Sequence, residues 1–127
     1  MDEAGEFRIL IIDDDPTHAA LMRKRLMDSD PSYRVEIAPT GESGVESVRK
    51  TKFALILLDY SLPDGDGLTF FDRIRAIDSS VHIVFVTAEN SAAIAVQAMK
   101  RGASDYIVKD ATYLENLVDR LKRAWVI

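Results

Sequence analysis

The sequence predicts an α/β domain built on an open, parallel sheet. Five short apolar runs alternate along the chain with five longer amphipathic stretches, and this alternation is typical of parallel βαβ units. Three of the runs, residues 9–12, 55–58 and 83–86, are apolar at every position. Such runs are expected for strands that are covered on both faces, so helices should lie on both sides of the sheet.

The expected elements leave no room for a second domain. Strands are expected at residues 8–12, 33–38, 54–58, 82–86 and 105–108. Helices are expected at residues 16–28, 41–50, 67–77, 91–101 and 112–125. Asp15 and Pro16 suit an N-cap and a first helical position, and Gly102 suits a helix C-terminus. One domain over residues 1–127, with a core at about 7–125, is expected in a chain of 127 residues.

Composition excludes several classes of function. The net charge is −5 and the cations form only isolated pairs, so no direct nucleic-acid partner is expected. With no cysteine there are no disulfides or thiolate metal sites. The longest apolar run, residues 53–58, is too short to span a membrane, and the acidic N-terminus is unlike a signal peptide. The expected location is cytoplasmic, away from the membrane.

Polar side chains follow four of the five expected strands. They are Asp13, Asp14 and Asp15 after the first strand, Asp59 after the third, Thr87 after the fourth and Lys109 after the fifth. In an open α/β sheet, ligands bind beyond the carboxyl ends of the strands, near the switch in strand order. If these strands are neighbours, the side chains converge on one crevice.

The chemistry of that crevice follows from its charges. Clustered carboxylates repel one another unless a cation intervenes, and oxygen-only ligands suit Mg²⁺ or Mn²⁺. A protonated lysine and a hydroxyl can contact phosphoryl oxygens, while one carboxylate can act as a nucleophile and form an acyl phosphate. The pattern therefore indicates magnesium-dependent acceptance of a phosphoryl group.

Four sequence segments together resemble the receiver domains of two-component response regulators. They read ILIIDDDP at 9–16, DYSLPDGDG at 59–67, TA at 87–88 and GASDYIVK at 102–109. The resemblance covers about residues 7–125 and is specific because the segments occur in this order and at these spacings. It implies a chemotaxis-receiver-like, flavodoxin-like fold: a doubly wound five-stranded parallel sheet of order 2-1-3-4-5 with five helices.

The resemblance also implies a role for each acidic residue. Asp59 is then the residue that is phosphorylated. Asp14 and Asp59 bind Mg²⁺ directly, Asp13 acts through water, and the backbone carbonyl of Ser61 supplies a further ligand. Asp15 lies beyond this group and is better explained as a helix N-cap.

Thr87 and Lys109 would contact the phosphoryl group, and Tyr106 would be an aromatic switch that moves with Thr87. The chain departs from the family at one position. A proline commonly follows the lysine in a cis peptide, whereas Asp110 stands here. Because a non-proline cis bond costs about 3–4 kcal/mol, the Lys109–Asp110 bond is either trans or strained.

Three functions remain open from the sequence. The leading hypothesis is a signalling module that takes a phosphoryl group from a histidine kinase or histidine phosphotransfer protein, and is no enzyme beyond assisting its own phosphotransfer and dephosphorylation. An aspartyl-phosphate phosphatase is disfavoured because Ser61 stands where a second aspartate is wanted. A phosphorylation-independent interaction domain would be favoured if an acidic or lysine position were missing, and none is.

The expected partner surface is formed by the fourth helix, the fifth strand and the fifth helix, where a homodimer is one alternative and a different protein the other. The sequence contains no output domain, so the chain is either a stand-alone regulator or a receiver from a longer protein. His18 and His82 are expected to be surface or helix-packing residues, since neither has a partner at metal-ligand spacing.

Overall fold

A computed structural model describes residues 6–125 and shows a five-stranded parallel sheet in the order β2-β1-β3-β6-β7. The strands are β1 (Phe7–Ile12), β2 (Tyr33–Ala38), β3 (Leu55–Leu58), β6 (His82–Thr87) and β7 (Asp105–Val108). In sequence order this is 2-1-3-4-5, so the expected strand order is confirmed. A short antiparallel pair, β4 (Ser61–Leu62) and β5 (Gly65–Asp66), lies outside the sheet.

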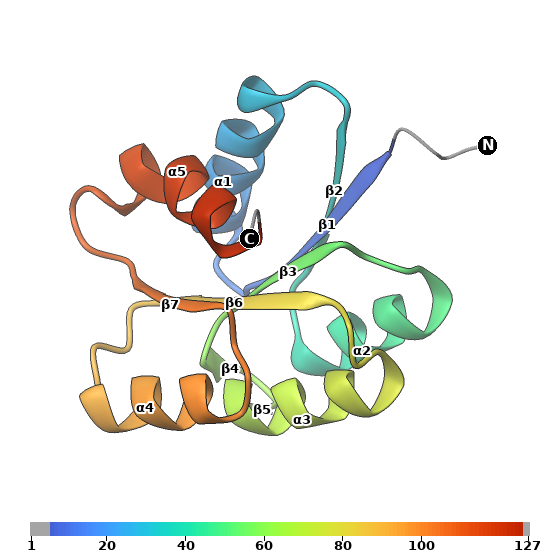
Figure 1. The fold of residues 1–127 in the computed structure, drawn as a ribbon, viewed down its shortest axis with the longest axis vertical. Coiled ribbons are helices and arrows are strands. Elements are labelled where there is room, and N and C mark those ends of the chain that lie inside the picture. The colour runs from blue at the N-terminus through green and yellow to red at the C-terminus, as the bar shows by residue number, and fades with distance from the viewer. Residues whose placement is uncertain (1–5, 126–127) are drawn as a thin grey trace.

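Five helices cover the two faces of the sheet (Figure 1). They are α1 (Pro16–Ser29), α2 (Gly41–Lys50), α3 (Gly67–Ile77), α4 (Ala92–Lys100) and α5 (Tyr113–Trp125). Figure 1 shows α1 and α5 on one face and α2, α3 and α4 on the other. No helix among residues 6–125 is long and apolar enough to cross a membrane.

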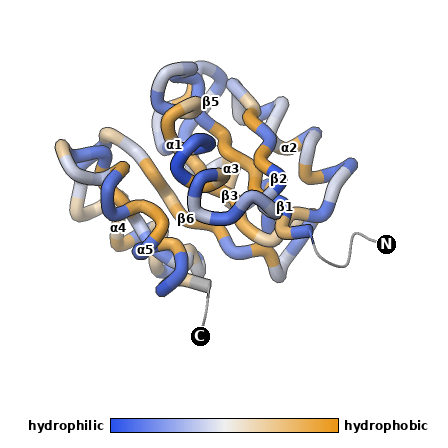
Figure 2. Tube along the Cα trace, turned by 90° about the horizontal axis from the view of Figure 1, so that it is seen from above, coloured by the Kyte–Doolittle hydropathy of each residue, from blue (hydrophilic) through white to orange (hydrophobic). Residues whose placement is uncertain are grey.

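Two apolar clusters hold these layers together. Alternate strand residues divide between them because successive side chains on a strand point to opposite faces. Ile9 and Ile11 of β1 pack with α1 and α5, while Leu10 and Ile12 pack with α2, α3 and α4. Figure 2 shows the central strands as hydrophobic and the helices as mixed along their length. The all-apolar runs in the sequence therefore reflect strands buried on both faces.

The register of the strands aligns their carboxyl ends. Ile12 of β1 lies opposite Leu58 of β3, and Asp59 N–H donates to the carbonyl of Ile12 at 3.0 Å. On the other side of β3, Lys109 N–H donates to the carbonyl of Thr87 at 2.8 Å. The residues that end β1, β3, β6 and β7 are thus brought to one edge, as the sequence predicts.

Local capping chemistry sets most of the helix ends. Asp15 caps α1 by accepting from the N–H groups of Thr17 and His18, which confirms the predicted N-cap. The helix α4 is shorter than predicted because Ser91 caps its start and Arg101 its end. Gly102 follows with a φ of +100°, a conformation that glycine adopts without steric cost.

Candidate functional site

Two buried carboxylates occupy the centre of the carboxyl edge. Asp13 follows β1 and is 2% exposed, while Asp59 follows β3 and is 7% exposed. The backbone of each is fixed by a neighbouring strand, since Asp13 N–H donates to the carbonyl of Ala38 and Asp59 N–H donates to the carbonyl of Ile12. Charged groups are rarely buried unless they are paired, so the position of these two residues requires a cation.

Lys109 supplies a positive charge between them. Its Nζ lies 2.7 Å from Asp13 Oδ2 and 3.4 Å from Asp59 Oδ2, and its side chain is 5% exposed. The other oxygen of Asp13 accepts a hydrogen bond from the N–H of Asp15. Burial raises the pKa of Asp13 even though the hydrogen bond from Lys109 acts in the opposite direction. One ammonium therefore offsets only part of the cost of burying this acidic edge.

The carboxylates of Asp13, Asp14 and Asp59 form a compact group that can hold a metal. One oxygen from each lies within 4.8 Å of the others. Asp14 is exposed, and within residues 6–125 its side chain has no hydrogen bond or ion pair. An all-oxygen set with an open side fits Mg²⁺, which keeps several waters and takes one or two carboxylates.

The loop after Asp59 turns sharply across the site. Ser61 N–H donates to Asp59 Oδ1 at 3.3 Å, and Gly67 N–H donates to the carbonyl of Tyr60 at the start of α3. A Cβ on Gly67 would lie 2.6 Å from the carbonyl oxygen of Asp59. Glycine at this position is therefore needed for α3 to begin directly against the acidic residue.

Thr87 and Tyr106 both bond to the backbone of one residue, Glu89. Thr87 is buried, and its Oγ1 accepts from the N–H of Glu89 at 3.2 Å. The hydroxyl of Tyr106 donates to the carbonyl of the same Glu89 at 2.7 Å. The ring of Tyr106 is half-buried and lies 5.8 Å from the ring of Phe85. Movement of the segment after β6 would therefore alter the hydrogen bonds of both side chains.

A cleft of about 430 Å³ opens above these groups. It is lined by Asp14, Asp15, His18, Asp59, Ser61, Thr87, Ala88, Glu89 and Lys109. Of the residues predicted for the site, Asp13 and Tyr106 are not part of this lining: Asp13 contacts the site through Lys109, and Tyr106 through Glu89. His18 and Glu89 line the cleft without having been predicted there.

Asp110 stands where receiver domains commonly have a proline, and the peptide bond before it is trans, since no peptide bond among the described residues is cis. The carboxylate of Asp110 accepts from the N–H of Thr112 at 3.0 Å and from its hydroxyl at 3.3 Å. Asp110 therefore contributes to the turn that leads into α5 and does not join the acidic cluster.

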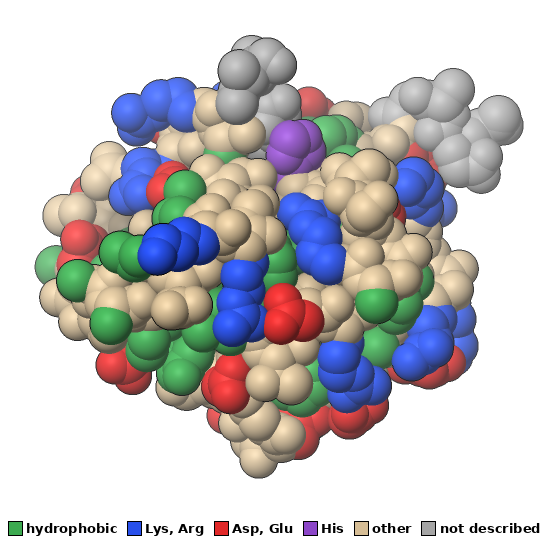
Figure 3. Space-filling model, turned by 60° about the horizontal axis from the view of Figure 1, so that its bottom comes forward, with side chains coloured by type: hydrophobic (Ala, Val, Ile, Leu, Met, Phe, Trp, Pro, Cys, Tyr) green, Lys and Arg blue, Asp and Glu red, His purple; other side chains and the backbone are tan. Residues whose placement is uncertain are grey.

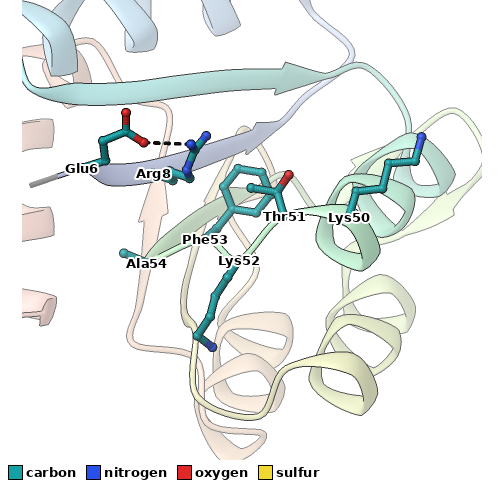
Figure 4. A pocket seen from close by; sticks show the side chains of 7 residues that line it. All are labelled: Glu6, Arg8, Lys50, Thr51, Lys52, Phe53 and Ala54. Atoms are coloured by element: carbon teal, nitrogen blue, oxygen red, sulfur yellow. Dashed lines mark hydrogen bonds and ion pairs between the residues drawn. The ribbon is translucent and has the colours of Figure 1, made fainter. Parts of the chain in front are cut away.

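The opposite edge of the sheet also carries a hollow, but its polar side chains do not point toward a common centre (Figure 4). It is lined by Glu6, Arg8, Lys50, Thr51, Lys52, Phe53 and Ala54. In Figure 4, Arg8 is paired with Glu6, and the side chains of Lys50 and Lys52 extend in different directions. The carboxyl edge is thus the better candidate for a reactive site.

Comparison with known proteins identifies the family of the chain. The family model described as the response regulator receiver domain matches residues 9–122. This chain belongs to the response regulator receiver family. Receiver domains are phosphoacceptor signalling domains of two-component systems that bind Mg²⁺ at an acidic cluster, and Asp13, Asp14 and Asp59 form such a cluster here.

Relatives and solved structures agree with this assignment. The transcriptional regulatory protein ZraR of Escherichia coli is 33% identical over 91% of this chain, which spans 26% of the length of that protein. A CheY-like receiver domain from Methanospirillum hungatei is 29% identical with a TM-score of 0.84, and the match covers 92% of this chain and 91% of that one. A response regulator from Burkholderia pseudomallei, solved with a phosphorylated aspartic acid, is 28% identical with a TM-score of 0.80, covering 91% and 66% of the two chains.

Proposed function

We propose that Asp59 accepts a phosphoryl group from a phosphohistidine of a histidine kinase or a histidine phosphotransfer protein. A carboxylate oxygen of Asp59 attacks phosphorus, the bond between phosphorus and the donor imidazole breaks, and an acyl phosphate forms on Asp59. The observation that carries the proposal is the position of Asp59 at the floor of the cleft, with Lys109 Nζ 3.4 Å from its Oδ2.

Lys109 and Thr87 are suited to hold the transferred group. The ammonium of Lys109 already lies between Asp13 and Asp59, and Thr87 lines the same cleft with its hydroxyl bonded to Glu89 N–H. Charge spreads over the phosphoryl oxygens during transfer, and fixed donors directed at those oxygens stabilise it without costly reorganisation. Both residues are therefore proposed to contact the phosphoryl group.

The acidic cluster is proposed to hold Mg²⁺. Asp14 and Asp59 are the proposed direct ligands, together with the backbone carbonyl of Ser61. Asp13 is proposed to act through water, because its two carboxylate oxygens already accept from Lys109 and from Asp15 N–H. When bound, the ion would neutralise charge shared between Asp59 and the incoming phosphoryl group.

The proposed switch operates through the backbone N–H and carbonyl of Glu89. A phosphoryl group that draws the Thr87 hydroxyl toward it weakens the bond from Glu89 N–H, and Tyr106 is bonded to the carbonyl of Glu89. Beryllofluoride with Mg²⁺ should therefore shift backbone resonances mainly within residues 87–110. Shifts confined to residues 30–50 would contradict this route.

The proposed docking surface comprises α4, β7 and α5. On α4, Val96 is 51% exposed and Met99 47% exposed, and across the surface Arg120 pairs with Asp105 at 2.9 Å. The occupant is proposed to be a second copy or a different protein. Sedimentation of the beryllofluoride-activated protein at tens of micromolar distinguishes them: a dimer that Arg120→Glu disrupts indicates the former, and an unchanged monomer the latter.

The extent, location and catalytic range of the receiver are proposed as follows. The receiver is proposed to occupy residues 1–127 as one domain with a core at about 7–125, to act in the cytoplasm, and to catalyse nothing beyond its own phosphotransfer and dephosphorylation. Direct nucleic-acid contact is not proposed, because the net charge is −5 and basic and acidic side chains are intermingled on the face shown in Figure 3.

Phosphate incorporation tests the proposal. Incubation with Mg²⁺ and acetyl phosphate should add one acid-labile phosphate, measured by intact mass, and Asp59→Asn should abolish it. Wild-type protein treated with a chelator serves as the metal control. Full labelling of Asp59→Asn would reject Asp59 as the acceptor.

A further inference from the structure

One hydrogen bond joins two segments beside the cleft that are far apart in the sequence. His18 lies in the first turn of α1, and its Nδ1 shares a hydrogen bond with the hydroxyl of Tyr113, the first residue of α5. The two rings lie 5.7 Å apart at 31°. His18 also lines the cleft above Asp59, so the bond lies at the wall of the phosphoryl site.

Both ends of this bond are held in place. The N–H of His18 donates to the capping carboxylate of Asp15 at 3.2 Å, and His18 Nε2 lies 3.9 Å from the other oxygen of Asp15. Tyr113 is 6% exposed and packs in the apolar cluster that includes Ala19 of α1 and Leu117 of α5. The bond therefore connects two fixed elements.

Tyr113 is in addition a neutral group that keeps its proton. Burial and the nearby charges of Asp13, Asp15 and Asp59 raise its pKa to about 12. Its hydroxyl is thus available as a hydrogen-bond donor to His18 over the whole physiological range of pH.

Only three residues separate Lys109 from Tyr113. On the amino side, Lys109 is fixed by its N–H bond to Thr87 at 2.8 Å. On the carboxyl side, Asp110 N–H donates to the carbonyl of Val108 at 2.7 Å and the Asp110 carboxylate accepts from Thr112 N–H, so these bonds of the turn are local and do not tie it to another element. Within the described residues, the His18–Tyr113 bond is the side-chain hydrogen bond that joins the start of α5 to α1.

We propose that His18 and Tyr113 are positioning residues for Lys109: their bond closes the loop that follows the lysine and fixes where its ammonium meets the phosphoryl group. The lysine side chain is flexible, and a small misplacement of a catalytic cation costs a large part of its effect on the rate. The inference rests on the proposed phosphoryl transfer to Asp59 and goes beyond it by adding two residues that do not touch the transferred group.

Two substitutions test the pair. Tyr113→Phe removes only the hydroxyl, and His18→Leu replaces the imidazole, with both of its nitrogens, by an apolar side chain at a partly exposed position. Each should slow phosphorylation by acetyl phosphate about threefold to tenfold, the effect of one hydrogen bond on a rate. The double variant should be no slower than either single variant. His18→Asn, whose amide can reach the place of Nδ1, should restore much of the rate.

A background without the lysine separates positioning from general stability. In Lys109→Ala protein, measured where thermal unfolding shows it to be folded, Tyr113→Phe should not slow the residual phosphorylation further. The matched control is His82, whose Nδ1 is bonded to the hydroxyl of Ser104 at the opposite end of β6, and His82→Leu should leave the rate unchanged.

Two results would overturn the inference. One is a wild-type rate in both Tyr113→Phe and His18→Leu. The other is an equal loss from Tyr113→Phe with and without Lys109. In either case the wild-type protein would still be labelled, whereas failure of the proposed function itself would leave the wild-type protein without phosphate.

Discussion

The two edges of the sheet use charged residues in opposite ways. At the carboxyl edge, Asp13, Asp59 and Lys109 are buried together, with side-chain exposures of 1%, 9% and 5%. At the amino edge, Lys52 pairs with Asp78 at 3.1 Å, but the lysine side chain is 75% exposed. Buried charges interact strongly and cost stability, whereas exposed pairs contribute about 0–1 kcal/mol. The comparison indicates that burying charges at the carboxyl edge costs stability, whereas the exposed lysine at the amino edge has little effect on it.

The largest expected difference between the edges comes from removing one lysine at each. Lys109→Ala leaves two buried carboxylates without their cation, so we expect about a hundredfold slower phosphorylation, similar to the effect of removing one preorganised donor from an enzyme active site. We also expect the free energy of unfolding to fall by about 3 kcal/mol.

Lys52→Ala is the matched variant at the amino edge. It should phosphorylate at the wild-type rate and lose less than about 1 kcal/mol of stability. Acetyl phosphate labelling and urea unfolding measure the two quantities. Similar rates for the two variants would show that the buried ion pair has no special role.

Metal binding should produce a smaller effect, confined to the carboxyl edge. A ligand that binds only the folded state stabilises it, so under the proposed site Mg²⁺ at ten times its dissociation constant should stabilise the fold by about 1.4 kcal/mol, or roughly 5 °C in melting temperature. Asp14→Asn should lose most of this shift.

Asp15→Asn provides the control, because asparagine caps a helix as well as aspartate and Asp15 is a cap rather than a predicted ligand. It should keep the full response to Mg²⁺ in thermal unfolding. An equal loss of the response in both variants would point to general charge screening in place of a defined site.

The smallest expected effect is at the amino edge and depends on pH. Burial would raise the pKa of Asp78, but hydrogen bonds from Ser80 and Lys52 outweigh it and lower the pKa to about 2. In the unfolded chain the pKa is about 3.9, so the carboxylate stabilises the fold above this pH and the contribution is lost as pH falls toward 2. We expect the free energy of unfolding of the wild-type protein to be about 1 kcal/mol higher than that of Asp78→Asn at pH 6. This difference should disappear near pH 2.

Denaturant unfolding between pH 6 and pH 2 measures this difference. The exposed pair of Lys24 and Asp28 is the control, and Asp28→Asn should change stability by less than about 0.5 kcal/mol at every pH. A difference for Asp78→Asn that grows as the pH falls would have the wrong sign.

Much of the fold was predictable because its signals are local. The runs 9–12, 55–58 and 83–86 report burial on both faces, and Asp15 and Gly102 mark helix ends through capping geometry. The predicted bounds of α2 and α3 agree with the structure, while β1 begins one residue earlier, at Phe7, and β6 extends to Thr87. The hairpin of β4 and β5 was missed because two-residue strands carry no periodic pattern.

The sequence predicted only those site residues that lie at the ends of strands. Each residue that follows a strand directly could be placed at the carboxyl edge, as Asp59 and Lys109 were. The bond between His18 and Tyr113 could not, because it joins residues 95 positions apart and depends on how α1 packs beside α5. His18 was interpreted as a surface or packing residue, and no signal in the sequence pairs a histidine with a distant tyrosine.

The most direct test locates the phosphoryl group in the sequence. Borohydride reduces an acyl phosphate to an alcohol, so phosphorylated aspartate becomes homoserine, which peptide mass spectrometry assigns to one position. After treatment with acetyl phosphate and Mg²⁺, homoserine should appear at position 59 and should be absent without the phosphodonor. Homoserine at position 13 or 14 with none at 59, or none at any position despite retained fold, would contradict the assignment of Asp59 as the phosphoacceptor.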